Sequence, residues 1–281
     1  MKTGNADLLA DGFKFLEAPK WHDGRIWLSD VFDLKLVSVT LDGRRQAVCD
    51  VPQRPAGQNF LPDGRHVVIS AMDQTLREVR DGRLLPYADL GGLATGHLND
   101  FAVDRAGRIY VGDFGYDYDA GEAPRPTRLY RVDPDGSVRV AIEGVEFPNG
   151  SVFVDGGRTL IVAETWVGRI TAFDCAADGT LSNRRLFADL SPRQPDGLCA
   201  DDEGAIWVAC FNTGEVLRVR DGGEITDRFA FEGSAISCVL GGDDGHTLFM
   251  TVFLGPPEEI NTEARKSAVF TARVAVPAPA A

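Results

Sequence analysis

One turn-and-strand phrase recurs six times along this 281-residue chain. In each copy a turn glycine is followed by a short apolar run, as in residues 26–28 and 206–208. Further turns and strands complete each unit, as in residues 169–187. The glycines are separated by 40, 43, 50, 47 and 41 residues, and they are Gly24, Gly64, Gly107, Gly157, Gly204 and Gly245. Four short strands per unit at this period are typical of a propeller blade.

We therefore predict an all-β fold, with a single six-bladed β-propeller domain over residues 1–281. The sixth unit ends in Pro-Ala-Pro-Ala-Ala and leaves no room for an outer strand. A segment around residues 12–16 precedes the first unit and fits no blade of its own. Because an open sheet edge favours unwanted pairing, we expect this N-terminal segment to supply the missing strand and close the ring.

Charge and cysteine content limit the possible partners and location. The net charge of −13 argues against binding to nucleic acid or to anionic membranes. The five cysteines are widely spaced without a Cys-x-x-Cys pair, and no apolar run approaches the 18 residues of a membrane span. We expect a cytoplasmic monomer or homodimer with reduced thiols. His22, His66 and His246 fall in or beside turns, so we interpret them as surface residues.

Inner strands line the channel of a propeller, so the residue that opens each unit should face the axis. Counting back eight residues from the turn glycine, or seven in the first unit, gives one residue per unit. These residues are Glu17, Ala56, Asn99, Asn149, Asp196 and Ser237. Four of them offer strong side-chain oxygen donors. The sequence therefore predicts a cluster of oxygen atoms at the axis.

Carboxylate and amide oxygens favour a hard cation, whereas zinc usually selects His and Cys. We expect one divalent cation, with Ca²⁺ preferred over Mg²⁺, Mn²⁺ or Zn²⁺. Without it, two facing carboxylates would repel each other and at least one would resist ionisation. Taken singly, Asn149-Gly150 and Asp196-Gly197 are also common turn dipeptides. Their shared offset within the units favours the metal site.

These motifs resemble the senescence marker protein, gluconolactonase and luciferin-regenerating enzyme family. The resemblance covers residues from about 9 to 276 and rests on Leu16-Glu17-Ala18-Pro19-Lys20-Trp21, Leu98-Asn99-Asp100 with Val103-Asp104, Pro148-Asn149-Gly150, and Pro195-Asp196-Gly197-Leu198. It implies a six-bladed propeller that hydrolyses lactones with one calcium-type metal in its channel. Glu17, Asn149 and Asp196 match the family's metal ligands. Asn99 matches an amide that binds substrate or, as in the related diisopropyl fluorophosphatases, the metal.

The chain departs from this family at His97, where many sugar lactonases carry a substrate-binding arginine. A shorter imidazole cannot replace that guanidinium fork, which argues against a sugar-acid lactone such as gluconolactone. We expect Asp196 to act as base or nucleophile, and His97 to be either a second base or a wall residue. The expected substrate wall is mostly aromatic, which suits a less polar lactone, and it comprises His97, Asn99, Phe114, Tyr116, Tyr118 and Trp166.

Two alternatives stay open at this point. A metal-dependent phosphotriesterase could use the same site, because both reactions develop negative charge on an oxygen facing the metal. A propeller that only binds or scaffolds is also possible, although a scaffold has no need for four oxygen donors at its axis.

Residues 113–127 and 254–266 form loops longer than their counterparts, and each is either a lid over the site or an ornament.

Overall fold

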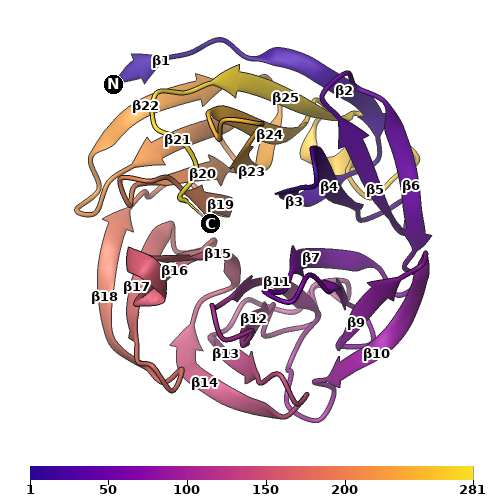
Figure 1. Cartoon of the computed structure of the whole chain (residues 1–281), viewed down its shortest axis with the longest axis vertical. Coiled ribbons are helices and arrows are strands. Elements are labelled where there is room, and N and C mark those ends of the chain that lie inside the picture. Colours follow the sequence, from indigo (N-terminus) through magenta and orange to yellow (C-terminus); the bar gives the residue numbers. More distant parts are fainter. Residues whose placement is uncertain (281) are drawn as a thin grey trace.

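The computed structural model describes residues 1–280 as six β-sheets set like blades around a channel (Figure 1). This arrangement confirms the predicted propeller. From the channel outwards, blade one contains β3 (Leu16–His22), β4 (Arg25–Asp30), β5 (Lys35–Thr40) and β6 (Arg45–Asp50). Blade two contains β7 (Pro55–Phe60), β8 (His66–Ser70), β9 (Thr75–Arg80) and β10 (Arg83–Asp89). Blade three contains β11 (Leu98–Val103), β12 (Ile109–Asp113), β13 (Thr127–Val132) and β14 (Val138–Val145).

Blades four to six follow the same plan. Their strands are β15 (Pro148–Val154), β16 (Thr159–Glu164), β17 (Arg169–Cys175) and β18 (Leu181–Asp189); β19 (Pro195–Ala200), β20 (Ile206–Cys210), β21 (Glu215–Val219) and β22 (Ile225–Ala230); and β23 (Ser234–Gly241), β24 (Thr247–Phe253) and β25 (Ser267–Arg273). Each inner strand packs against the next, and β23 packs against β3, so the ring is closed.

The predicted turn glycines join the first two strands of every blade. All six have positive φ, between 72° and 92°, a conformation that glycine adopts at little cost. The strand after each turn is apolar because both faces of the sheet are covered by neighbouring blades. β20, for example, is buried at all five of its residues, and Ile206 and Val208 pack against Ile170 of blade four. The hydrophobic core thus lies between blades, and it keeps the inner strands rigid.

The last blade is completed by the N-terminal segment, as predicted. β2 (Asp7–Phe13) pairs antiparallel with β25, with Asp7 opposite Thr271 and Phe13 opposite Ser267. Its side chains Ala10 and Phe13 are buried in the cluster shared by blades six and one. A second pairing was not anticipated: β1 (Lys2–Thr3) adds in parallel to β22 at the edge of blade five. The N-terminus therefore ties two blades together.

The end of the described chain lies at the centre of the ring on the face seen in Figure 1, which we call the tail face. The backbone N–H of Ala278 donates to the carbonyl of Gly245 at 2.9 Å, and that of Asp202 donates to Pro277 at 2.9 Å. Ala278 and Pro279 also line a cavity whose other walls are inner strands. The tail thus lies across this mouth of the channel.

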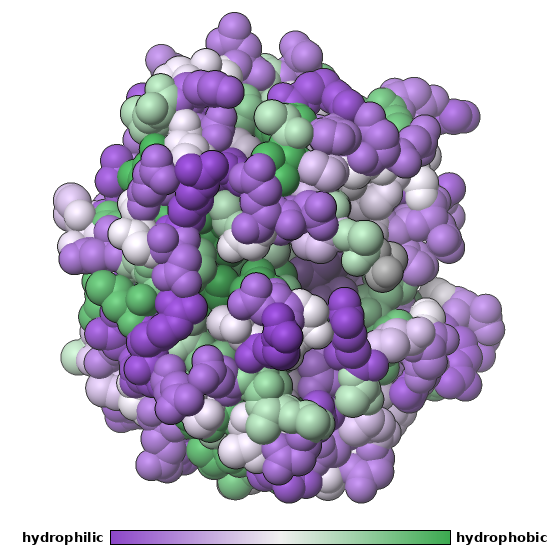
Figure 2. Space-filling model, turned by 60° about the vertical axis from the view of Figure 1, so that its left-hand side comes forward, coloured by the Kyte–Doolittle hydropathy of each residue, from purple (hydrophilic) through white to green (hydrophobic). Residues whose placement is uncertain are grey.

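Hydrophilic side chains cover most of the face seen in Figure 2, in keeping with the high charge content of the sequence. Within residues 1–280, no helix has the length and apolar character needed to cross a membrane. One surface assignment was wrong: His66 is 7% exposed, and its Nε2–H donates a 2.7 Å hydrogen bond to Gln58 Oε1. It lies in an aromatic cluster with Phe60 and Trp27. His22 and His246 are half-buried.

Candidate active site

Each inner strand has a β-bulge near its first residues, and this irregularity directs the axis residues into the channel. In blades three to five two residues oppose one on the neighbouring strand, at Asn99-Asp100, Asn149-Gly150 and Asp196-Gly197. In blade one the bulge directly follows Glu17. Bulges bend a strand and redirect a side chain out of the ladder. The repeated bulge is therefore what brings residues from separate blades to one point.

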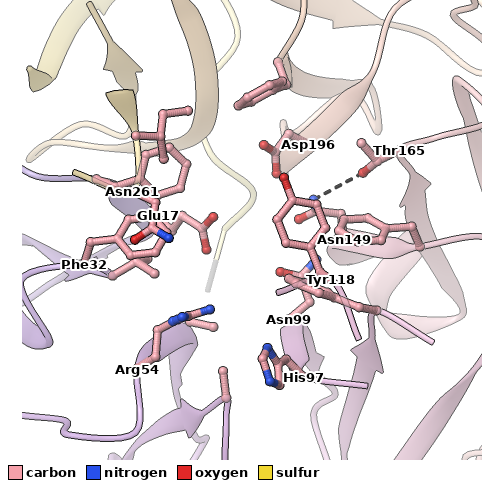
Figure 3. A pocket seen from close by; sticks show the side chains of 18 of the residues that line it. Glu17, Phe32, Arg54, His97, Asn99, Tyr118, Asn149, Thr165, Asp196 and Asn261 are labelled. Carbon is pink, nitrogen blue, oxygen red and sulfur yellow. Dashed lines mark hydrogen bonds between the residues drawn. The ribbon is translucent and has the colours of Figure 1, made fainter. Parts of the chain in front are cut away.

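Five of the six predicted axis residues line one cavity of about 470 Å³, and all of these except Ala56 carry a side-chain oxygen. Figure 3 shows Glu17 and Asp196 pointing into it from opposite sides, with Asn149 and Asn99 beside Asp196. Asp196 and Asn99 are 8% and 5% exposed, so only the cavity gives access to them. The structure thus brings together Glu17, Asn99, Asn149 and Asp196, as the sequence predicted.

The two carboxyl groups are in an unfavourable electrostatic environment when no cation is present. Burial raises the pKa of Glu17 to about 7, with a further rise from the Asp100 carboxylate and a partial offset from Arg54. Burial also raises the pKa of Asp196 well above its ordinary value, and the charges on Glu17 and Asp100 add to that rise. A buried carboxylate without a compensating positive charge prefers to stay protonated. The pair therefore fits a cation.

The amide side chains are oriented in the same sense. Asn99 donates through Nδ2 to the carbonyl of Pro148 at 3.2 Å, and Asn149 donates through Nδ2 to Thr165 Oγ1 at 3.2 Å. Thr165 in turn donates to the carbonyl of Pro195 at 2.8 Å. Because the nitrogen of each amide is engaged, its Oδ1 is left for a ligand. Among residues 1–280 no group of three or more His, Cys, Asp and Glu side chains is placed to hold a metal ion, so a cation at the axis would need amide ligands as well.

Ser237, the sixth axis position, lies elsewhere. It pairs with Thr251 inside the sheet, and the extra residue of that strand is Ile236. Ile236 is fully buried against Phe15 and Phe253. In blade six the regular pairing between the first two strands continues for more residues before the bulge than in the other blades. Counting eight residues back from Gly245 therefore stops at Ser237, one residue short of the bulge at Ile236. This side of the channel is therefore apolar.

The aromatic wall is partly as expected. His97, Phe114, Tyr118 and Trp166 line the cavity. Tyr116 does not: it is 2% exposed and lies behind Trp166, whose Nε1 donates to its hydroxyl at 2.8 Å. Tyr116 thus supports Trp166 rather than facing the cavity.

Both long loops reach the cavity. The loop after β12 contributes Phe114, Tyr118 and Asp119, and the loop after β24 contributes Pro257, Glu258, Ile260 and Asn261. Phe114 stacks on Phe147 with ring centroids 4.6 Å apart, which anchors the first loop at its base. The loops therefore form the walls on the face opposite the tail.

Three functional candidates were missed from the sequence. Arg54 and Asp119 line the cavity, and Asp100, next to Asn99 in the chain, is a further carboxyl group whose pKa is raised by desolvation. The unit alignment holds a signal for Arg54, because the position two residues before the axis residue is a wall position in four blades. The residues at this position that line the cavity are Phe15, Arg54, His97 and Phe147.

Comparison with known proteins gives a consistent result. A family model described as SMP-30/Gluconolactonase/LRE-like region matches residues 15–253. Regucalcin from Danio rerio is 30% identical over 210 residues, 72% of this chain and 67% of the relative. A pentonolactonase from Haloferax volcanii is 29% identical over 192 residues, 61% of this chain and 64% of the relative. The matched segments thus span about two thirds of these relatives' length.

A solved structure supports the same fold. The structure of a calcium-binding protein, regucalcin, from Agrobacterium tumefaciens superposes with a TM-score of 0.82. It is 21% identical in sequence and the match covers 99% of this chain and 96% of that one. At this identity the likeness concerns the fold alone.

Proposed function

The chain belongs to the SMP-30/gluconolactonase/LRE-like family, and we propose that it is a divalent-metal-dependent hydrolase that opens the ring of a small lactone. The observation that carries this proposal is the set of two carboxyl groups, Asp196 buried and Glu17 half-buried, and two oriented amide oxygens in one cavity. A relative that is named as a pentonolactonase and another described as calcium-binding add support.

Glu17, Asn149 and Asp196 would hold the cation, with Asn99 as a fourth ligand or a substrate contact. A bound divalent cation would polarise the lactone carbonyl and stabilise the developing oxyanion. Ca²⁺ is the first candidate, because the donors are all oxygen. Asp100 would add negative charge behind the site.

Asp196 is the candidate base. Its carboxylate would take a proton from the water that attacks the carbonyl carbon, and the ring oxygen would leave as a hydroxyl group. His97 stands on the cavity wall with its Nδ1 3.8 Å from Asp119, and this partner on the long loop supports a substrate-binding role. Thr165 would position Asn149 through their hydrogen bond.

The wall favours a lactone less polar than a sugar lactone. Five aromatic side chains without a hydroxyl group line it, and they offer few partners for hydroxyl groups: Phe15, Phe32, Phe114, Phe147 and Trp166. Each buried hydroxyl left unpaired costs about 1–3 kcal/mol. We therefore expect alkyl-substituted lactones to be hydrolysed with a higher kcat/KM than gluconolactone.

The test combines elemental analysis with kinetics. Metal content is measured on the purified protein, and turnover of gluconolactone, an alkyl-substituted γ-lactone and an organophosphate triester is compared before and after chelation. We expect chelator-sensitive hydrolysis with the alkyl lactone as the best substrate. Turnover that survives complete removal of metal would contradict the metal role. A clear preference for gluconolactone would contradict only the substrate class.

A further inference from the structure

Arg54 is the one permanently charged cation among the described residues that line the site cavity. Its side chain is 19% exposed, and Figure 3 shows it reaching into the cavity on the same side as Glu17 and close to His97. The other charged residues of the lining are acidic, namely Glu17, Asp119, Asp196 and Glu258. A guanidinium in such surroundings calls for an explanation.

The backbone holds Arg54 in place at some cost. Its φ is 68°, a left-handed conformation that is strained for any residue other than glycine. Hydrogen bonds on both sides fix it: its N–H donates to Val51 at 3.0 Å, and Ala71 donates to its carbonyl at 2.8 Å. The guanidinium carbon lies 5.4 Å from the centre of the Phe32 ring. The head group is therefore presented to the cavity by a rigid support.

A carboxylate from the long loop already occupies this head group. Asp119 Oδ2 lies 3.1 Å from Nη2, and Asp119 Oδ1 accepts from Nη1 at 3.5 Å. Nε of Arg54 makes no hydrogen bond within residues 1–280. His97 Nδ1 lies 3.8 Å from Asp119 Oδ2 and is buried without a hydrogen-bond partner in the described chain. Arg54 and His97 thus converge on one carboxylate and still have donor capacity to spare.

We propose that Arg54 and His97 form a subsite for a carboxylate carried by the lactone substrate, and that this carboxylate displaces Asp119. The inference rests on the proposed lactonase function and narrows its substrate to a lactone with an apolar body and one anionic group. Guanidinium–carboxylate pairs are strong and directional when both nitrogens of the fork engage. Asp119 reaches both terminal nitrogens, but one contact is as long as 3.5 Å and Nε is left over, so a substrate carboxylate can replace it through closer contacts.

The position of Arg54 relative to the axis suits this role. Arg54 and Glu17 line the same cavity, and Figure 3 shows them on the same side of it. A carboxylate carried on the lactone ring would then face Arg54 while the ring carbonyl faces the axis. Displacing Asp119 would also free the loop that carries Phe114 and Tyr118. Substrate binding and loop position are thus coupled.

The experiment compares two lactones of the same shape, 5-oxotetrahydrofuran-2-carboxylate and its uncharged carboxamide. For the unmodified protein we expect a higher kcat/KM for the carboxylate. Arg54→Gln should reduce the ratio of carboxylate to carboxamide kcat/KM by about 10- to 100-fold, the range for losing a charge-assisted pair. Arg54→Lys should keep part of the ratio. Asp119→Asn should lower KM for the carboxylate by a few-fold, because the competing anion is gone.

A second measurement separates this inference from the proposed function. Binding of tetrahydrofuran-2-carboxylate, which has no lactone to open, is measured by calorimetry on the metal-loaded protein and on Arg54→Gln. Weaker binding by the variant supports the subsite even if no lactone is hydrolysed. Three results for Arg54→Gln would overturn the proposed subsite: an unchanged ratio of carboxylate to carboxamide kcat/KM, an equal fall in kcat/KM for both lactones, or an unchanged calorimetric affinity. Arg54 would then only hold the loop in place through its ion pair with Asp119.

Discussion

Asp196 and Glu17 act in two different electrostatic situations, with and without a cation between them. In the metal-free protein burial raises the pKa of both carboxyl groups, the charge on Asp100 raises both further, and the charge on Glu17 adds to the rise at Asp196. In the loaded protein the same charges would become ligands. The two residues can therefore be distinguished by what their neutral analogues do to stability and to turnover.

We predict that Asp196→Asn abolishes lactone turnover, with a loss of at least about 1000-fold, because both a charge and the candidate base disappear. The metal-free variant should melt no lower than the unmodified protein, since a buried carboxyl with a raised pKa has been replaced by an amide. Glu17→Gln is the matched control, and it should chiefly weaken metal affinity. Wild-type metal content and rate in both variants would refute the axial site.

His66 gives a prediction about pH. Burial, helped by the charge of His22, lowers the pKa of His66 to about 4. The folded protein therefore keeps it neutral while the unfolded chain binds a proton below about pH 6.5. The resulting loss of stability grows as the pH falls from about 6.5 to 4, and it reaches on the order of 3 kcal/mol.

The measurement is urea unfolding of the metal-free protein between pH 4.5 and 7.5, compared with His66→Gln. The variant should lose less stability towards acid than the parent, although it is less stable at neutral pH. Gln58 links His66 to the backbone at Ala18, next to Glu17, so the effect also concerns the support of the site. Parallel curves for the two proteins would show that His66 does not control the acid response.

At the level of elements, strand β2 should be indispensable and strand β1 should not. Deleting residues 1–14 removes the outer strand of blade six and its buried side chains Ala10 and Phe13. We expect a loss of roughly 5 kcal/mol, which lowers Tm by on the order of 10 °C. The control deletes residues 1–5, which removes only the two-residue pairing with β22 and should change Tm little. Equal melting of the longer deletion would contradict this account.

Periodicity made the elements predictable, because a fixed turn and four strands per unit leave few other folds. It also located Glu17, Asn99, Asn149 and Asp196, since the bulge recurs at the same place in each blade. The same spacing does not hold at Ser237, because the paired part of this hairpin is longer and its bulge lies at Ile236. It also missed the burial of His66 beside a turn and the retreat of Tyr116 behind Trp166, because both depend on contacts between blades that no local pattern records.

At the scale of the whole molecule, a bound metal should stabilise the closed ring. The axis oxygens come from blades one, three, four and five, so a cation at the axis would join four separate sheets. A ligand at about 100 times its Kd stabilises the folded state by about 2.7 kcal/mol. We predict that chelation lowers Tm by several degrees and that Ca²⁺ restores it. In Asp196→Asn the same treatment should have little effect, and an equal shift in that variant would place the metal elsewhere.

The pairing of β2 with β25 has a consequence for synthesis on the ribosome. Asp7 pairs with Thr271, so β2 is synthesised long before its partner β25. At about 5–20 residues per second, the interval between the two is roughly 15–50 s. During it, a seven-residue edge strand has no partner within its own blade and could recruit the strand of another nascent chain. The acidic side chains Asp7 and Asp11 in β2 oppose such recruitment, and the chain reaches its protected form only when both ends meet.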